Sequence, residues 1–370
     1  MENKKPSLRA VLTTSVFLAV LGGFFLLNRL IAPPDILASE RRAPAALPAL
    51  TGETLRSAEF MSGFESYAAD SFVFRDGLRT VRAATVFYIF QQTDKSGLYR
   101  GETGAGKFEK LNETSLRQAA QKINLLAASL DGLNLYCAVV PDKSLYAGRY
   151  LPGFDPESVR RILGEELDGL TPIDLTPALA AEDFYRTDLH WDQTRLSGVT
   201  GALGGAMGFD ARADYMSRAL GAFQGVYAGQ LALPMGADTM AYLTNGAIDG
   251  ASARYLNPRT GALEDGPVYD EAAFAGQDPY DVFLRGAQPL VILENPSAQT
   301  DRELYLFRDS FSSSLAPLLL SAYARVTLID LRYIDSRVLP EYVTFTPGAD
   351  VLFLYSSQIL TNATALLVNG

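Results

Sequence analysis

The sequence contains one cysteine, one histidine and one tryptophan among 370 residues. A single cysteine, Cys137, excludes an intramolecular disulfide, a zinc site built from several cysteines and a Cys-x-x-Cys redox pair. A single histidine, His190, excludes every site that needs two imidazoles, so any histidine chemistry has one possible position. These counts exclude the metal sites that need several cysteines or histidines, and we expect no metal and no cofactor in this chain.

The chain also has few positive charges outside its N-terminus. Residues 1–32 carry a net charge of +3, whereas the remaining 338 residues carry −13. An acidic body repels phosphate backbones, so we expect no nucleic-acid partner. Hydrophobic residues make up 48% and charged residues 20% of the chain, which is typical of a globular protein with a sizeable core.

An uncharged run spans residues 10–27 and follows a basic N-terminal tail. As a helix these residues would be ~27 Å long, close to the thickness of the hydrocarbon core of a bilayer. The run is long for a signal peptide, and Leu30-x-Ala32 is a poor cleavage site. We expect an uncleaved single-pass anchor with a cytoplasmic N-terminus in the membrane of a bacterial cell. The alternatives are a removed signal peptide and a buried helix of a soluble domain.

The rest of the sequence divides by composition. Residues 1–32 are the predicted tail and anchor, and residues 33–50, rich in proline and alanine, are a predicted linker. Residues 51–370 are then one extracytoplasmic domain, with a β-rich insertion at about 210–290 where glycine, tyrosine and turn pairs are frequent. Within this domain predicted helices alternate with short apolar strands, which predicts an α/β fold with a mainly parallel sheet.

Local patterns predict several individual helices and strands. Apolar residues recur at helical spacing over 54–69 and 71–88, which predicts two amphipathic helices. The run 134–140 predicts a buried strand, and 303–307 predicts another strand that leads into a helix.

The only histidine lies two residues after Asp188. In an extended segment this spacing puts both side chains on one side, so the carboxylate can hold Nδ1–H of His190 and leave Nε2 free as a general base. The alternative is a lone histidine that is hydrogen-bonded in a partly buried turn. Trp191, which opens a predicted helix, and Tyr185 flank this base and could stack on a sugar ring, although Trp191 could equally belong to the core.

A second candidate segment is the strand that runs into Asp309 and Ser310 and then into a helix. A serine at a helix N-terminus lies beside backbone N–H groups that can stabilise an oxyanion. A serine needs a base to act as a nucleophile, and His190 is the one histidine available. The alternative is that Asp309 or Ser310 only caps the helix.

Together these segments resemble the DHHW protein family of bacteria and, more distantly, alginate O-acetyltransferase proteins with an SGNH-hydrolase-like domain. The resemblance includes the N-terminal span and covers most of residues 50–365. Four segments carry it: DLHW at 188–191, RDSF at 308–311 with its continuation to 323, IDLRY at 329–333 and VLFLYSSQIL at 351–360. It implies a flavodoxin-like three-layer domain in which Ser310 is the nucleophile, His190 the general base and Asp188 the residue that orients the base. Leu189 stands in place of the first histidine of the family motif, and Arg308 in place of a glycine.

Further residues are candidates for contact with a substrate. Arg308 could bind an anionic group or change the shape of the site where the oxyanion forms, and its neighbour Asp309 is a candidate as well. Arg332 and Tyr333 follow a predicted strand at the edge where α/β sites form, although Arg332 could instead pair with an aspartate. Asn295, after the strand that begins at Leu290, is the asparagine that could serve as an oxyanion donor.

The resemblance implies a serine-dependent O-acetyltransferase or esterase that acts on O-acetyl groups of a cell-surface polysaccharide. It also implies a membrane-bound O-acyltransferase as a partner that exports the acetyl group. The alternative is a protein that retains the fold without catalysis and binds glycan or serves as a scaffold for envelope assembly.

Overall fold

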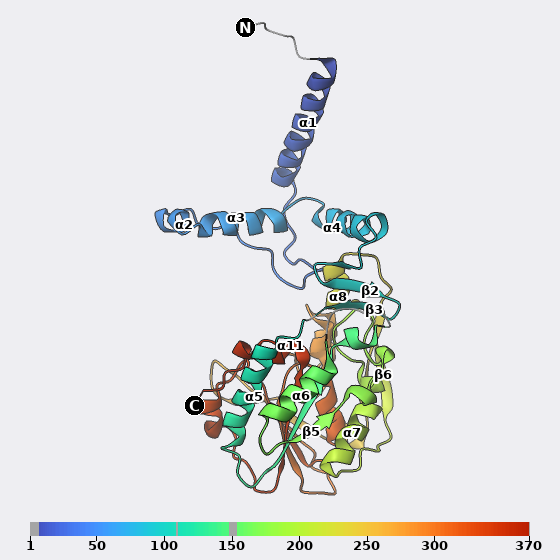
Figure 1. Cartoon of the computed structure of the whole chain (residues 1–370), viewed down its shortest axis with the longest axis vertical. Helices are drawn as coiled ribbons and strands as arrows, with labels where there is room; N and C mark the ends of the chain where they lie inside the picture. The colour runs from blue at the N-terminus through green and yellow to red at the C-terminus, as the bar shows by residue number, and fades with distance from the viewer. Residues whose placement is uncertain (1–6, 109, 148–153, 370) are drawn as a thin grey trace. The chain divides into compact units, whose positions relative to one another are not determined.

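The computed structural model describes residues 7–108, 110–147 and 154–369. Residues 1–6 of the predicted cytoplasmic tail lie outside the described residues. Contacts divide the chain into two compact units (Figure 1). The N-terminal unit consists of residues 1–92 with 232–234, and the α/β unit consists of residues 93–231 and 235–370.

The N-terminal unit is helical. Its elements are α1 (Leu8–Leu30), α2 (Gly52–Arg56), α3 (Glu59–Asp70), α4 (Arg75–Ala84) and the π-helical turn η1 (Thr85–Ile89). Helix α1 has 23 residues, a mean hydropathy of 2.3 in its most apolar window and no buried residue, so it is long and apolar enough to cross a membrane. The two amphipathic stretches predicted from helical spacing are confirmed as α2 with α3 and as α4 with η1.

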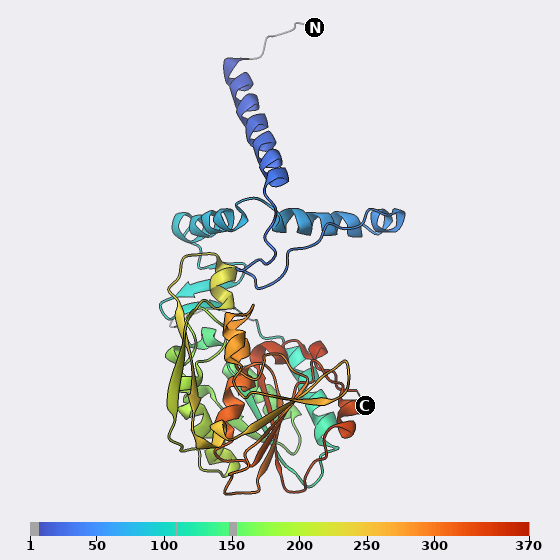
Figure 2. The ribbon, with the colours of Figure 1, turned by 180° about the vertical axis from the view of Figure 1, so that it is seen from behind.

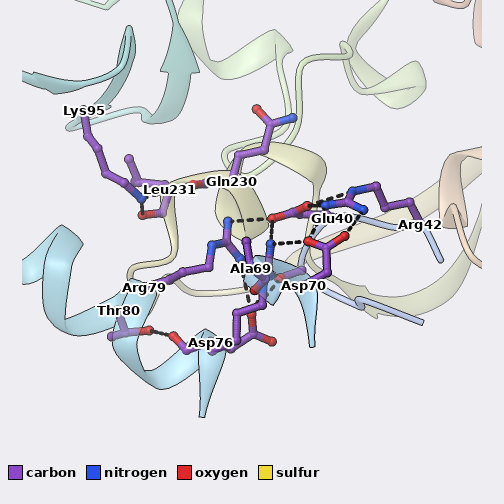
Figure 3. A network of polar contacts seen from close by, with 12 residues as sticks. Glu40, Arg42, Ala69, Asp70, Asp76, Arg79, Thr80, Lys95, Gln230 and Leu231 are labelled. Carbon is purple, nitrogen blue, oxygen red and sulfur yellow. Dashed lines mark hydrogen bonds and ion pairs between the residues drawn. The ribbon is translucent and has the colours of Figure 1, made fainter. Parts of the chain in front are cut away.

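Residues 33–50 are predicted to be a linker, but in the structure part of this segment is bound to α3 and α4. The guanidinium of Arg42 donates to both carboxylate oxygens of Asp70, at 2.6 and 2.8 Å, and Glu40 pairs with Arg75 and Arg79 (Figure 3). The Arg42 guanidinium lowers the pKa of Asp70 to about 2, so this carboxylate stays charged at neutral pH. These ion pairs place residues 51–92 in the N-terminal unit, and the α/β unit begins at Thr93.

The α/β unit contains a small sheet, a large sheet and a strand pair. The small sheet has β1 (Asp94–Lys95), β2 (Leu98–Gly101) and β3 (Gly104–Lys107). The strands of the large sheet are β4 (Asn134–Val140), β5 (Thr171–Asp174), β8 (Ser252–Leu256), β9 (Leu263–Gly266), β10 (Leu290–Glu294), β11 (Glu303–Arg308), β12 (Arg325–Ile329) and β13 (Asp350–Ser356). The helices are α5 (Glu113–Ala127), α6 (Pro156–Glu166), α7 (Ser197–Met207), α8 (Val226–Leu231), α9 (Gly246–Asp249), α10 (Phe311–Leu319) and α11 (Ser357–Leu360), with short 3₁₀ turns between them.

The large sheet has the strand order β5-β4-β13-β11-β12-β10-β8-β9. Figure 2 shows the α/β unit, which contains this sheet, from behind. The five strands from β5 to β12 in this order pair in parallel, whereas β10, β8 and β9 pair antiparallel. The predicted mainly parallel sheet is therefore confirmed. Because the carboxyl ends of parallel strands meet at one edge, the segments that follow β4, β11, β12 and β13 lie along the same edge.

Helices cover both faces of this sheet, since successive strand residues point to opposite sides. On one face, Leu304 and Leu306 of β11 pack in a core with residues of α7 and α10. On the other face, Tyr305 and Phe307 pack in a second core with residues of α5 and α6. The unit is thus a three-layer α/β/α sandwich, as predicted.

The β-rich insertion contains β6 (Met216–Phe223) and β7 (Asp238–Thr244), which pair antiparallel. It also supplies β8 and β9 to one end of the large sheet. A third apolar cluster joins Phe223, Met240 and Tyr280 of this insertion to Tyr185, which lies five residues before His190. The insertion therefore packs against the segment that carries the only histidine.

Candidate active site

The turn between β11 and α10 leaves the hydroxyl of Ser310 free of a capping role. Asp309 Oδ1 accepts the backbone N–H of Phe311 at 3.1 Å, and Oδ2 accepts that of Ser356 at 2.6 Å. Asp309 therefore accepts a backbone N–H of the first turn of α10 and links the end of β11 to the end of β13. The side chain of Ser310 makes no cap hydrogen bond, although this residue is the N-cap of α10.

Three side chains from distant parts of the sequence form a hydrogen-bonded chain. His190 Nδ1 lies 2.8 Å from Asp188 Oδ1, and His190 Nε2 lies 2.9 Å from Ser310 Oγ. Asp188 and His190 are buried, whereas Ser310 is half-buried. With the Nδ1 proton held by the carboxylate, Nε2 can accept the proton of the serine hydroxyl. The arrangement can therefore activate a serine that reaches the protein surface.

The carboxylate of Asp188 is held on its second oxygen as well. Oδ2 accepts the backbone N–H of Val226 at 2.9 Å, at the start of α8. The residue before it, Gly225, lies so close that a Cβ atom there would be 2.3 Å from Asp188 Cβ. Only glycine fits this approach, so the insertion fixes both the position and the rotamer of Asp188.

Aromatic rings hold the imidazole of His190 in place. The Tyr280 ring stacks on it at 3.7 Å between centroids and 5° between planes, and Phe311 lies 5.1 Å away on a tilted plane. The hydroxyl of Tyr280 is 2.8 Å from Ser314 Oγ in α10. Tyr280 therefore links the imidazole to the helix that begins at the serine. Sequence analysis did not identify Tyr280, because nothing local marks a tyrosine 90 residues after the histidine.

A buried lysine, Lys143, holds the backbone of the same segment. Its Nζ donates to the carbonyl oxygens of Tyr185 at 2.7 Å and of Asp188 at 3.0 Å. Burial lowers the pKa of Lys143 to about 8, while nearby carboxylates oppose that shift. Lys143 is the third residue after the end of β4. A charged residue just after a strand predicted to be parallel is the signal that sequence analysis overlooked.

Four other predicted contact residues face the protein interior. Trp191 is fully buried, and its indole N–H is 2.9 Å from Ser314 Oγ. Tyr185 is buried with its hydroxyl 3.4 Å from the sulfur of Met240. Arg308 and Asp309 are also buried, and burial lowers the pKa of the Arg308 guanidinium, which donates to Ser313 Oγ. These side chains therefore contact protein and not a substrate in this structure.

The remaining candidates lie at opposite edges of the sheet. Arg332 and Tyr333 follow β12 at the edge that carries Ser310, and Tyr333 is 51% exposed. The Arg332 guanidinium donates to both carboxylate oxygens of Asp330, which is one of the predicted alternatives. Asn295 follows β10, which runs antiparallel to β12, so it lies at the far edge, where its amide donates to the carbonyl of Leu320. The structure does not bring Asn295 to Ser310.

Within the described part of the chain, no group of three or more His, Cys, Asp and Glu side chains is arranged to hold a metal ion. The one cysteine, Cys137 in β4, is buried, and burial raises the pKa of its thiol to about 12. A thiol in this environment is unreactive near neutral pH.

The three-layer sandwich with a serine at the carboxyl edge of its sheet is an SGNH-hydrolase-like fold. Structures of this class are similar to the α/β unit. A DHHW family protein from Eubacterium siraeum matches 75% of this chain and 98% of its own, with 18% identity and a TM-score of 0.62. PatB1 from Bacillus cereus matches 73% and 99%, with 17% identity and a TM-score of 0.58.

The O-acetyltransferase domain of AlgJ from Pseudomonas putida matches 72% of this chain and 93% of its own, with 12% identity and a TM-score of 0.42. No model of a known protein family matches the sequence, and no curated protein matches it. The predicted resemblance to the DHHW family is therefore confirmed at the level of the fold.

Proposed function

We propose that the protein is a membrane-anchored, extracytoplasmic acetyl-transfer enzyme that uses Ser310, His190 and Asp188. The observation that carries this proposal is the hydrogen-bonded chain from Asp188 through His190 to Ser310 Oγ. A carboxylate, an imidazole and a hydroxyl in this order are the components that acyl transfer through a serine requires.

The reaction has two steps. Ser310 Oγ attacks the acetyl carbonyl carbon of a donor ester, and its proton moves to His190 Nε2 and then to the departing alcohol. The acetyl group is then bound to Ser310 as an ester. A sugar hydroxyl next gives its proton to Nε2 and attacks the acetyl carbon. The bond from this carbon to Ser310 Oγ then breaks, Nε2 returns the proton to Oγ, and the acetyl group is left as an ester of the sugar. Water in place of the sugar releases acetate, so the same residues support an esterase.

The oxyanion of each step would form at the N-terminus of α10. Among the described residues, the backbone N–H of Ser310 donates to no protein acceptor, so it is available to an oxyanion. The dipole of α10 favours negative charge at the same place. Tyr333 and Arg332, which reach the surface at this edge, are the side chains that we propose contact the acceptor.

The location and partners follow from α1 and from the family resemblance. We propose that α1 is an uncleaved anchor with its N-terminus in the cytoplasm, and that the α/β unit acts outside the cytoplasmic membrane. The acceptor would be a cell-surface polysaccharide, and a membrane-bound O-acyltransferase would supply the acetyl group. The α/β unit shares its fold with PatB1 from Bacillus cereus and with the DHHW family protein from Eubacterium siraeum.

The test uses the full chain in detergent with p-nitrophenyl acetate and a panel of neutral and acidic oligosaccharides. A transferase produces acetylated oligosaccharide, detected by mass spectrometry, and Ser310→Ala produces none. An esterase releases acetate from acetylated oligosaccharides but forms no sugar ester. Equal, background rates for the unmodified chain and for Ser310→Ala with every acceptor and donor would contradict the proposal and favour a glycan-binding protein without catalysis.

Lys143→Met is expected to lower kcat about 10- to 100-fold, because the segment that carries Asp188 loses its support. The variant also leaves two carbonyl groups without their donor, so the free energy of unfolding falls by about 2–5 kcal/mol. Initial rates below the melting temperature and urea unfolding measure the two effects.

Lys122 provides the matched control. Lys122 lies on α5, away from the serine. Its Nζ also donates to two carbonyl oxygens, those of Ala363 and Leu366. Lys122→Met is expected to lower stability and to leave kcat unchanged, whereas Lys143→Arg restores part of kcat. If Lys143→Met and Lys122→Met change kcat alike, Lys143 does not position the site.

A further inference from the structure

Helices α3 and α4 of the N-terminal unit each have one apolar face that no part of the described chain covers. On α3 this face contains Met61 and Phe64, which are 55% and 42% exposed. On α4 it contains Leu78 and Val81, which are 44% and 63% exposed, and Phe74, the N-cap residue of this helix, is also 63% exposed. These positions follow the spacing of three and four residues that defines one side of a helix.

The opposite faces of both helices are occupied. Asp70 of α3 accepts hydrogen bonds from Arg42 and from the backbone N–H of Ala45, and Gly63 lies against Pro48. On α4 the guanidinium of Arg79 donates to Ser39 at 2.7 Å. Figure 3 shows Glu40, Arg42 and Asp70 joined by polar contacts of this kind. The two helices are therefore amphipathic, with the polar side bound to the 37–48 segment.

The turn between α3 and α4 is attached to the carboxyl end of α1. The side chain of Asn28 accepts the backbone N–H of Val73 at 2.7 Å, and the ring of Phe72 stacks on that of Phe24 at 5.2 Å. Asn28 is the first polar residue after the apolar run of α1. If α1 spans a bilayer, this turn lies where the hydrocarbon core ends, and Phe72 lies beside its last apolar turns.

We propose that α3 and α4 lie in the head-group region of the same membrane that α1 crosses, with their apolar faces in the lipid. This inference rests on the proposed function only in that α1 is taken as a membrane anchor. From the end of α1 the two helices lead away in opposite directions (Figure 1). Lipid is the occupant favoured by the structure, because the turn between α3 and α4 is attached to the carboxyl end of α1 by the Asn28 hydrogen bond and by the stacked rings of Phe72 and Phe24.

The composition of the face agrees with this location. Besides Phe64 and Phe74, the aromatic residues Tyr88 and Phe90 after α4 are exposed. Aromatic side chains are enriched where a membrane meets water, and amphipathic helices in that plane bury their apolar side among the acyl chains. Residues 52–90 would then adhere to the bilayer surface instead of forming a free spacer between the anchor and the α/β unit.

The test places an environment-sensitive fluorophore, the NBD group, on single introduced cysteines in the full chain. The labelled protein is reconstituted alone into vesicles of phosphatidylcholine and phosphatidylglycerol. Some vesicles contain lipids with a doxyl quencher near the head group, and others contain lipids with the quencher near the bilayer centre. Phe64→Cys and Val81→Cys report on the two apolar faces. Ser66→Cys is the matched control, because Ser66 is exposed on α3 but points away from Met61 and Phe64 by helical spacing.

Leu18→Cys, in the middle of α1, tests the anchor separately. The buried Cys137 is unreactive, and the labelled parent chain measures the background. Far-UV circular dichroism of each labelled protein checks that it is folded.

The expected result is at least about twofold stronger quenching of the labels at 64 and 81 than of the label at 66, by the quencher near the head group. The label at 18 is expected to be quenched most by the deep quencher. Equal quenching at 64, 66 and 81 would overturn the proposal while leaving the anchor intact. Blue-shifted emission at 64 and 81 without quenching would also overturn it, because a second protein copy would then cover the face. Absence of deep quenching at 18 would overturn the anchor together with this proposal.

Discussion

Ser310→Ala is expected to lower the rate of acetyl transfer and of p-nitrophenyl acetate hydrolysis by at least about 10³-fold. The substitution removes the hydroxyl that lies 2.9 Å from His190 Nε2 and changes little else, because this hydroxyl makes no cap hydrogen bond with α10. The fold is therefore expected to keep its melting temperature. Release of p-nitrophenol by the full chain in detergent measures the rate.

Ser312→Ala is the control for this variant. Ser312 is buried two residues further along α10, and its hydroxyl has no partner among the described residues. Its removal is expected to leave the rate unchanged. A rate for Ser310→Ala within twofold of the parent chain would show that another group performs the chemistry.

Asp188→Asn is expected to lower kcat by about 10²–10⁴-fold with a smaller effect on KM. Both carboxylate oxygens of Asp188 accept hydrogen bonds, one from the His190 ring and one from the backbone N–H of Val226. An amide offers one acceptor and one donor group, so in either orientation an N–H would face another donor. The imidazole then loses the tautomer that leaves Nε2 free to accept the proton of Ser310. Steady-state rates at several substrate concentrations separate kcat from KM.

Asp350→Asn is the control for the loss of a buried carboxylate that does not contact His190. Asp350 is buried at the start of β13, at the other edge of the sheet, and accepts from Arg302 and Tyr323. Asp350→Asn is expected to lower the melting temperature and to keep kcat. If the two variants lower kcat equally, the effect of Asp188 is structural and the account of the base is wrong.

The sequence predicted the elements that local pattern determines. The strand 134–140 and the strand that leads into Asp309 and Ser310 were confirmed, because apolar runs bounded by turn residues determine such strands. The approach of His190 to Ser310 could be predicted because the chain has one histidine and because Ser310 lies at a predicted strand-to-helix turn in a segment that resembles the DHHW family. The hydrogen-bond distances now show that these two segments meet.

What the sequence could not predict depends on contacts between distant segments. Trp191 and Arg308 were candidates for substrate contact, yet the core buries both, and no local pattern tells a buried aromatic or arginine from one that lines a site. Tyr280 stacks on His190 from the insertion, and Gly225 approaches Asp188 from the same insertion. Both contacts depend on how the insertion folds back on the sheet, which periodicity along one segment does not specify.

The boundary of the α/β unit could not be predicted from the sequence pattern either. Proline and alanine over residues 33–50 indicated a free linker, but Glu40 and Arg42 are bound by charged residues some 30 residues later in the chain. Ion pairs of this kind depend on which helix faces meet, so composition alone assigned residues 51–92 to the following domain.

The proposed mechanism depends on one covalent event, the transfer of an acetyl group to Ser310. The most direct measurement is peptide mass spectrometry of the full chain, quenched in acid shortly after mixing with p-nitrophenyl acetate. One added acetyl group is expected on the peptide that contains Ser310, assigned to that residue and not to Ser312, Ser313 or Ser314. The group is expected to be absent from His190→Ala. An unmodified Ser310 in a chain that still releases p-nitrophenol would contradict the mechanism.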